Sequence, residues 1–106
     1  MAWIYLVVAG ALEVAWAFAM KQSAGFSRLT PTVITLVTMV ASFWLLSLAM
    51  KALPLGTAYL IWTGIGAVGA FVLGIVFLGE PLNAMRVVAA TLVVAGMILM
   101  KLSSPA

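Results

Sequence analysis

The chain has 106 residues, of which 67% are hydrophobic and 7% are charged, with a formal net charge of +3. This composition is typical of a membrane protein and excludes an ordinary soluble domain. The five Lys and Arg residues are too dispersed for a nucleic-acid patch, and the absence of His and Cys removes the usual metal ligands, disulfides and thiol chemistry. We therefore expect no metal and no other cofactor.

Four hydrophobic segments follow one another along the chain, separated by charged residues, Pro and Gly. They cover about residues 2–20, 32–50, 57–78 and 82–100. Each is long enough to cross a bilayer as a helix. The connections are short, which favours antiparallel helical hairpins, and Pro31 and Pro81 suit the first turn of the second and fourth helices. The sequence thus predicts an all-α membrane protein in which residues 1–106 form a single four-helix transmembrane domain.

Glu13 is the one acidic residue inside these segments. A carboxylate at the centre of a bilayer costs a few kcal/mol on insertion scales. We therefore expect Glu13 to bind a proton, a cation, or each in turn. The first segment is predicted to be a span rather than a signal peptide, because it lacks a basic start and Glu13 interrupts its apolar run.

Aromatic and hydroxyl side chains at helical spacing suggest a cation site around this carboxylate. Trp16 follows Glu13 by about one turn, Ser42 lies in the second helix, and Tyr59 and Trp62 lie about one turn apart in the third. Indole rings can box a cation by cation–π attraction worth about 1–2 kcal/mol when desolvated. Hydroxyls can orient the carboxylate or accept hydrogen bonds from a substrate. The alternatives are plain helix packing for the aromatic residues and a bond to its own helix for Ser42.

The chemistry of a desolvated carboxyl group connects these residue types to transport. Such a group favours its protonated form, and a planar guanidinium-like cation can displace the proton through bidentate hydrogen bonds. If proton and cation compete for Glu13, neither is bound while the other is. Mutual exclusion of this kind gives antiport.

Several other positions have secondary roles. Gly10 allows close helix approach next to Glu13. Met39 and Phe43 are interpreted as packing residues or as a lipid-facing portal. Gly64 and Gly66 indicate either tight packing or a bend in the third helix, and the sequence leaves that choice open.

Basic residues are almost evenly divided between the two ends of the predicted helices. One side holds Lys21, Arg28 and Arg86, and the other holds Lys51 and Lys101. The positive-inside rule needs an excess on one side, so either a weak bias fixes one orientation or both orientations are inserted. Insertion in both orientations would let the chain pair with an inverted copy of itself. An antiparallel homodimer of this kind would supply the inverted repeat that many transporters place around a midplane site.

Long and specific runs of residues indicate a family. They are residues 25–29 (GFSRL) and residues 53–66 (LPLGTAYLIWTGIG). Together with Glu13 and the four spans, they resemble the small multidrug resistance family over essentially the whole chain. Residues 13–17 (EVAWA) are similar to its guanidinium-exporter subtype, because the quaternary-ammonium exporters tend to lack a Trp one turn after the Glu.

The resemblance implies an antiparallel, dual-topology homodimer that exports guanidinium and small substituted guanidinium cations in exchange for protons across the bacterial inner membrane. It also implies a binding role for Glu13, Trp16, Ser42, Tyr59 and Trp62. The fourth helix is the expected dimerisation element. There, Ala89 stands where the family often has Gly, seven residues before Gly96, and it is slightly less permissive of close approach.

Other functions compete with this interpretation. Residues 42–46 (SFWLL) also occur in drug-exporting relatives, so the nearest alternative is a multidrug exporter of quaternary ammonium and lipophilic cations. A small dual-topology ion channel is more distant, since a channel needs no protonatable centre. A proton-carrying subunit of a rotary motor is a further alternative. Such subunits resemble two-helix hairpins, so four spans with the carboxylate in the first fit them poorly. An enzyme is not expected, because no nucleophile–base pair or metal cluster is present.

Overall fold

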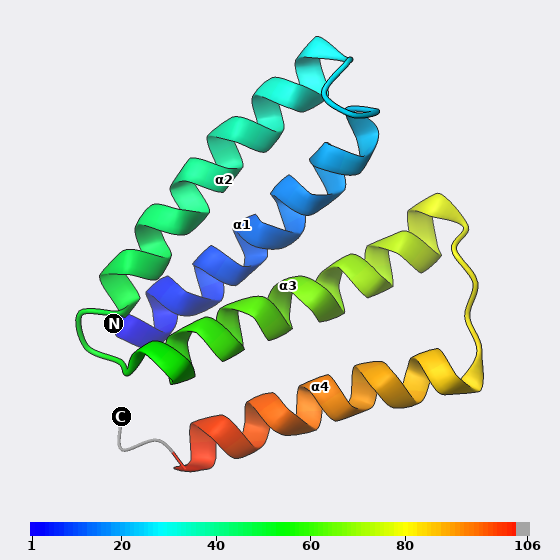
Figure 1. The fold of residues 1–106 in the computed structure, drawn as a ribbon. Coiled ribbons are helices and arrows are strands. Elements are labelled where there is room, and N and C mark those ends of the chain that lie inside the picture. Colours follow the sequence, from blue (N-terminus) through cyan, green and yellow to red (C-terminus); the bar gives the residue numbers. More distant parts are fainter. Residues whose placement is uncertain (104–106) are drawn as a thin grey trace.

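The computed structural model describes residues 1–103, which form four helices joined by short connections (Figure 1). They are α1 (Ala2–Gln22), α2 (Leu29–Ala49), α3 (Leu55–Leu78) and α4 (Ala84–Ser103). Each helix is long and apolar enough to cross a membrane. The predicted all-α, four-helix architecture is confirmed for this part of the chain.

The end of α3 is fixed by a left-handed glycine. Gly79 has φ 66° and ψ 25°, and its N–H donates to the carbonyl oxygen of Gly74. The N–H of Glu80 donates to the same carbonyl at 3.0 Å. Left-handed glycines end helices in this way because they carry no Cβ that would clash. The connection to α4 therefore turns sharply at this point.

The start of α4 differs from the expectation. The helix begins at Ala84, and the side-chain oxygen of Asn83 accepts the N–H of Arg86 at 2.9 Å. Asn is a favoured residue for capping a helix start in this way. The expectation that Pro81 lies in the first turn of α4 is therefore wrong, because the cap is placed after it. Pro31 does lie in the first turn of its helix, α2.

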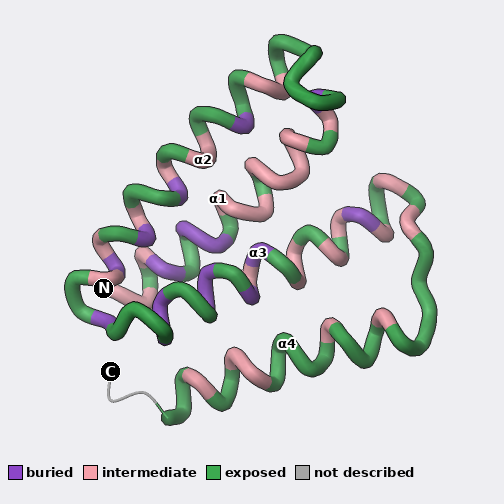
Figure 2. Tube along the Cα trace, viewed as in Figure 1, coloured by how far each residue is buried: buried purple, intermediate pink, exposed green. Residues whose placement is uncertain are grey.

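The core is formed where α1 lies between α2 and α3 (Figure 1). The buried apolar residues are Leu6, Ala9, Leu46, Ala49, Leu53, Ala58, Ile61 and Trp62. They lie near the start of α1, the end of α2 and the start of α3 (Figure 2). The buried apolar residues are therefore concentrated at one end of the three-helix unit.

Helix α4 is attached to the rest of the chain along α3. No residue of α4 within the described range is buried (Figure 2). Near its C-terminal end, the Lys101 ammonium lies 4.4 Å from the centre of the Trp3 ring, which is a cation–π contact. The described chain is flat, with extents of 43 × 34 × 16 Å. Much of the apolar surface of α4 is thus left to face lipid or another protein.

Glycines allow α1 and α3 to approach closely. A Cβ added at Gly10 would lie 2.7 Å from Cγ2 of Ile65, and one added at Gly69 would overlap the side chain of Val14. Small residues at helix contacts are a main source of stability between helices in lipid, where apolar burial alone drives little association. Each helix therefore contributes a glycine to the same interface.

Gly64 and Gly66 lie inside one unbroken helix, α3. A Cβ at Gly64 would meet the side chain of Met97 from α4, and one at Gly66 would overlap the carboxyl group of Glu13. Both glycines thus lie at close helix contacts, which favours the packing interpretation. A bend at this point stays a prediction.

Replacing Gly10 with Ala should destabilise the fold. The added methyl would overlap Ile65, whose branched side chain has little freedom to move, so we expect a loss of about 1–3 kcal/mol in the free energy of unfolding. The control is Gly56→Ala, where no atom lies within 4 Å of the added Cβ. Reversible unfolding in mixed micelles measures both variants, and equal stability would contradict the proposed α1–α3 contact.

Candidate functional site

Ser42 joins the first three helices through two hydrogen bonds. Its buried hydroxyl donates to the carbonyl oxygen of Ala9 on α1 at 2.7 Å. The same oxygen accepts the indole N–H of Trp62 on α3 at 3.0 Å. The alternative that Ser42 bonds its own helix is therefore not realised. In an apolar surrounding, each satisfied donor and acceptor fixes its partner in place, because leaving any of them unpaired is costly.

A row of aromatic rings runs beside this junction. Trp16 meets Phe43 with ring centres 6.2 Å apart, and Phe43 meets Trp62 at 5.7 Å, both in edge-on arrangements. Tyr59 continues the row, 5.6 Å from Trp62. These separations lie within the range of favourable aromatic pairs. The row therefore brings together side chains from α1, α2 and α3.

Glu13 lies about one turn from the Ser42 junction. It follows Ala9 by four residues on α1, and its carboxyl group lies against Gly66, which follows Trp62 by four residues on α3. Residues four apart share a helix face, so the carboxyl group and the junction occupy neighbouring levels of one interface. Without a side chain at Gly66, α3 leaves the space that the carboxyl group fills.

Two polar atoms at this level have no partner in the part of the chain that the structure describes. They are Oε1 of Glu13 and Nε1 of Trp16, and both are buried. Buried polar atoms in proteins are normally hydrogen-bonded, so an unpaired acceptor indicates a place for a ligand donor or a proton. The arrangement combines an unpaired carboxyl oxygen with a nearby row of aromatic rings, which is chemically suited to a cation.

The remaining predicted positions lie around this centre or away from it. Met39 is half-buried on α2, one turn before Phe43. Phe43 itself is 47% exposed, yet it contacts two indole rings. Ala89 and Gly96 lie on α4, where Ala89 is exposed and Gly96 partly so. Neither α4 residue belongs to the Glu13 site within this chain.

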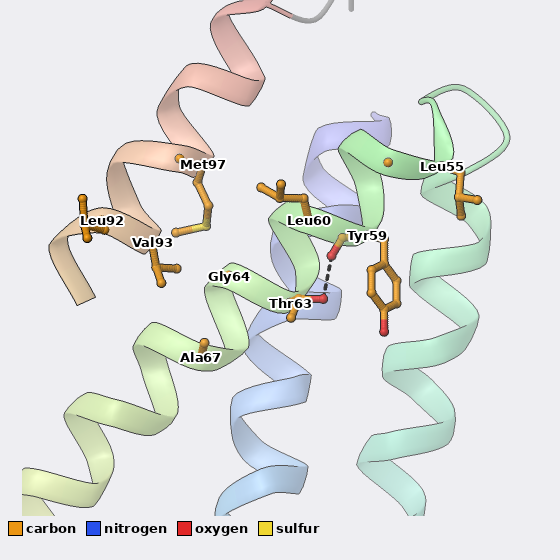
Figure 3. A pocket seen from close by; sticks show the side chains of 11 residues that line it. Leu55, Tyr59, Leu60, Thr63, Gly64, Ala67, Leu92, Val93 and Met97 are labelled. Atoms are coloured by element: carbon orange, nitrogen blue, oxygen red, sulfur yellow. Dashed lines mark hydrogen bonds between the residues drawn. The ribbon is translucent and has the colours of Figure 1, made fainter. Parts of the chain in front are cut away.

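A groove lies between α3 and α4, away from Glu13 (Figure 3). It encloses about 770 Å³. Its lining residues are Leu55, Gly56, Tyr59, Leu60, Thr63, Gly64, Ala67, Leu92, Val93, Gly96 and Met97. Glu13 does not line it, and the lining is almost entirely apolar, so the groove is a poor cation site. Tyr59 is the one predicted binding residue that lines it.

Sequence reasoning did not predict the ring contacts of Phe43 and missed the backbone carbonyl of Ala9. The ring of Phe43 contacts those of Trp16 and Trp62, which agrees with the packing alternative, and a portal role stays a prediction. The carbonyl of Ala9 carries no sequence signal, because any residue supplies one.

Comparison with known proteins shows to which family the chain belongs. The family model described as Small Multidrug Resistance protein matches residues 1–93. The chain belongs to the small multidrug resistance family. The guanidinium exporter of Yersinia pseudotuberculosis is 61% identical over 104 residues, covering 98% of this chain and 100% of the relative. Those of Escherichia coli K12 and Salmonella typhimurium are 59% and 58% identical over 104 residues, covering 98% of this chain and 99% of each relative.

Membership in this family confirms the resemblance drawn from the sequence runs. With four helices that can each cross a membrane, the chain is a multi-pass protein of the bacterial inner membrane. Its similar proteins carry transporter names rather than enzyme names. Among the residues that the structure describes, no three His, Cys, Asp or Glu side chains gather as a metal site requires.

Replacing Ser42 with Ala should lower stability and release Trp62. The change leaves the indole N–H of Trp62 unpaired and removes the bond to the Ala9 carbonyl, which costs about 1–3 kcal/mol in unfolding free energy. The matched control is Ser47→Ala, because the Ser47 hydroxyl is exposed and bonds only within its own helix, to the carbonyl of Trp44. Unfolding titrations and the ¹⁵N signal of the Trp62 indole measure the effect. An unchanged Trp62 signal in Ser42→Ala would contradict the junction.

Proposed function

We propose that this chain exports guanidinium-like cations in exchange for protons, with Glu13 binding each in turn. The observation that carries the proposal is the Glu13 carboxyl group, seated against Gly66 with one buried oxygen unpaired among the described residues. The relatives named guanidinium exporters, about 60% identical over nearly the whole chain, support the same substrate class.

The neighbouring side chains suit a planar cation. A guanidinium ion can donate two parallel hydrogen bonds to the carboxylate, and its face can lie on an aromatic ring. Trp16 and Trp62 offer such rings at the levels next to Glu13, and Tyr59 extends the row beyond Trp62. Ser42 acts indirectly, because its bond to the Trp62 indole holds that ring in a fixed orientation. A proton on Glu13 removes the negative charge and turns one of the two acceptor oxygens into an O–H donor. The proton and the cation therefore exclude one another.

The working unit in this proposal is an antiparallel homodimer with dual topology. A flat chain 16 Å thick encloses little space on its own, and α4 presents apolar surface with no buried residue in the described range. A second, inverted copy would cover that surface, with Ala89 and Gly96 at the contact between the two α4 helices. It would also bring two Glu13 carboxyl groups to a shared axis.

The aromatic row also supports a second candidate function. The aromatic row can also bind methylated ammonium ions, since cation–π attraction needs no hydrogen-bond donor. A multidrug exporter of quaternary ammonium cations is therefore the second candidate. A passive channel fits less well because it has no use for a buried carboxyl group, and the proposal includes no enzymatic activity.

Replacing Glu13 with Gln should abolish coupled exchange. The amide cannot release a proton or carry the charge that binds a cation, so guanidinium-driven proton movement should fall to the level of protein-free liposomes. Ser47→Ala in the same liposomes is the control and should retain the activity. Exchange that survives in Glu13→Gln would contradict the mechanism. Tetraalkylammonium ions in the same assay separate the two substrate classes.

Single cysteines should be labelled from both sides of the membrane. The chain has no native cysteine, so Ala52→Cys between α2 and α3 gives one thiol per chain. If both orientations are inserted in similar numbers, a membrane-impermeant maleimide added outside intact cells should label about half of the chains. Complete labelling or complete protection from one side would contradict dual topology.

A further inference from the structure

The guanidinium group of Arg86 is held in position between two helices, but one of its donors has no partner. Arg86 is partly buried in the first turn of α4 and lies over the Phe71 ring of α3, 5.7 Å from the ring centre. Its Nε is buried and has no hydrogen-bond partner in the part of the chain that the structure describes. Buried N–H groups normally donate to an acceptor, so the unpaired Nε indicates a place for a ligand oxygen.

The charges around Arg86 favour an anionic ligand. Lys21, Arg28 and Arg86 lie at the same end of the four helices. The one acidic residue at this end of the described chain is Glu80, whose carboxyl group lies against Gly74 and shares a cavity with Lys21. No ion pair joins Glu80 to Arg86 among the described residues. The start of α4 adds the partial positive charge of a helix N-terminus, so this end attracts negative charge.

An apolar space leads from Arg86 toward the middle of the membrane. A cavity of about 250 Å³ lies between α3 and α4, with Phe71 and Arg86 in its lining. Ala67 and Val93 line both this cavity and the groove of Figure 3, so the two spaces adjoin. Along α4 the combined space extends from Arg86 to Met97. That length of helix is about 16 Å, which is close to half of the ~30 Å hydrocarbon core of a bilayer.

Hydrocarbon fits this space better than water does. Apart from Arg86, all residues that line the smaller cavity are apolar. Water finds no hydrogen-bond partners along such a lining, whereas a lipid tail fills it with van der Waals contacts. Because the tail of any phospholipid can make these contacts, the headgroup at Arg86 decides which lipid is preferred.

We propose that an anionic phospholipid binds between α3 and α4, with its phosphate on Arg86 and one acyl chain along the groove. This inference goes beyond the proposed function and does not depend on it. A guanidinium group binds a phosphate through two parallel hydrogen bonds, and basic pockets between transmembrane helices are suited to anionic headgroups. Ala89 and Gly96, which we place at the contact between two α4 helices, line the same space. The lipid therefore lies beside the second copy in the proposed homodimer.

Replacing Arg86 with Gln should weaken the binding of phosphatidylglycerol by about 3–10-fold, because a basic contact with an anionic headgroup is lost. The matched control is Arg28→Gln, since Arg28 lies at the same end but is exposed and donates to the carbonyl oxygen of Gln22. Native mass spectrometry of the full chain in detergent, with phosphatidylglycerol or phosphatidylcholine added, measures the lipid that is retained.

The unsubstituted protein should retain one phosphatidylglycerol per chain and less phosphatidylcholine. Equal retention in Arg86→Gln and the unsubstituted protein would overturn the proposal. An equal loss in Arg28→Gln would mean general attraction to a basic surface, and would overturn it as well.

A second pair of variants tests the place of the acyl chain without changing any charge. Ala90 is partly buried and lines the cavity, so Ala90→Leu should displace the lipid and lower its retention by a similar factor. The control is Ala95→Leu, which adds the same volume at an exposed position of α4 that lines neither space. Undiminished retention in Ala90→Leu would contradict an acyl chain in this cavity.

The ¹⁵N signal of the Arg86 Nε separates a lipid from a free anion and from a second copy of the chain. In phosphatidylcholine bicelles, added phosphatidylglycerol should shift this signal, whereas inorganic phosphate at the same concentration should not. A shift with phosphate would mean an ion site without a lipid, and no shift with phosphatidylglycerol would mean no headgroup contact. Either result would overturn the proposal. So would a dimer that retains no phosphatidylglycerol in the mass spectrum, because the second copy would then fill the groove.

Discussion

The close contact between α1 and α3 is the constraint on which the rest of the structure depends. Gly10 on one helix and Gly69 on the other remove the side chains that would keep the two backbones apart. The same contact seats Glu13 on Gly66 and brings Ala9 near the Ser42–Trp62 pair. In lipid, apolar side chains gain little by leaving their surroundings, so close backbone packing and hydrogen bonds must hold the helices together. The proposed binding site and the fold thus use one interface.

The interface contains both side chains that are fixed by hydrogen bonds and side chains that can change rotamer. The Trp62 indole and the Ser42 hydroxyl are fixed by two hydrogen bonds in a buried setting. Phe43, by contrast, contacts Trp16 and Trp62 edge-on and is half exposed. Exposed side chains change rotamer far faster than helices move. In the proposed transport function, a mobile Phe43 would let cations of different size enter while Trp62 keeps its orientation.

Much of the fold was predictable because hydrophobic runs of membrane length leave few alternatives. The sequence also singles out Glu13, since a lone carboxyl group among apolar residues is costly unless it is used, and its role in binding stays a prediction. The start of α4 was not predictable, because Pro81 and Asn83 are both good helix-start residues. The sequence alone does not determine which of the two begins the helix. The partner of Ser42 was also hidden, because the choice between its own helix and Ala9 depends on how helices meet. Whether the predicted binding residues act in transport is left to the proposed experiments.

Because α4 makes few contacts within its own chain, the stability of this protein depends on what covers α4 in the membrane. Within its own chain, α4 meets α3 and, at one end, Trp3, and it buries none of its described residues. Its remaining surface can be covered by lipid or by a second copy, and the balance between them follows mass action. In the proposed homodimer, the number of chains per unit area of membrane then helps to set the free energy of folding. Expression level would thereby become one of the physical parameters of the fold.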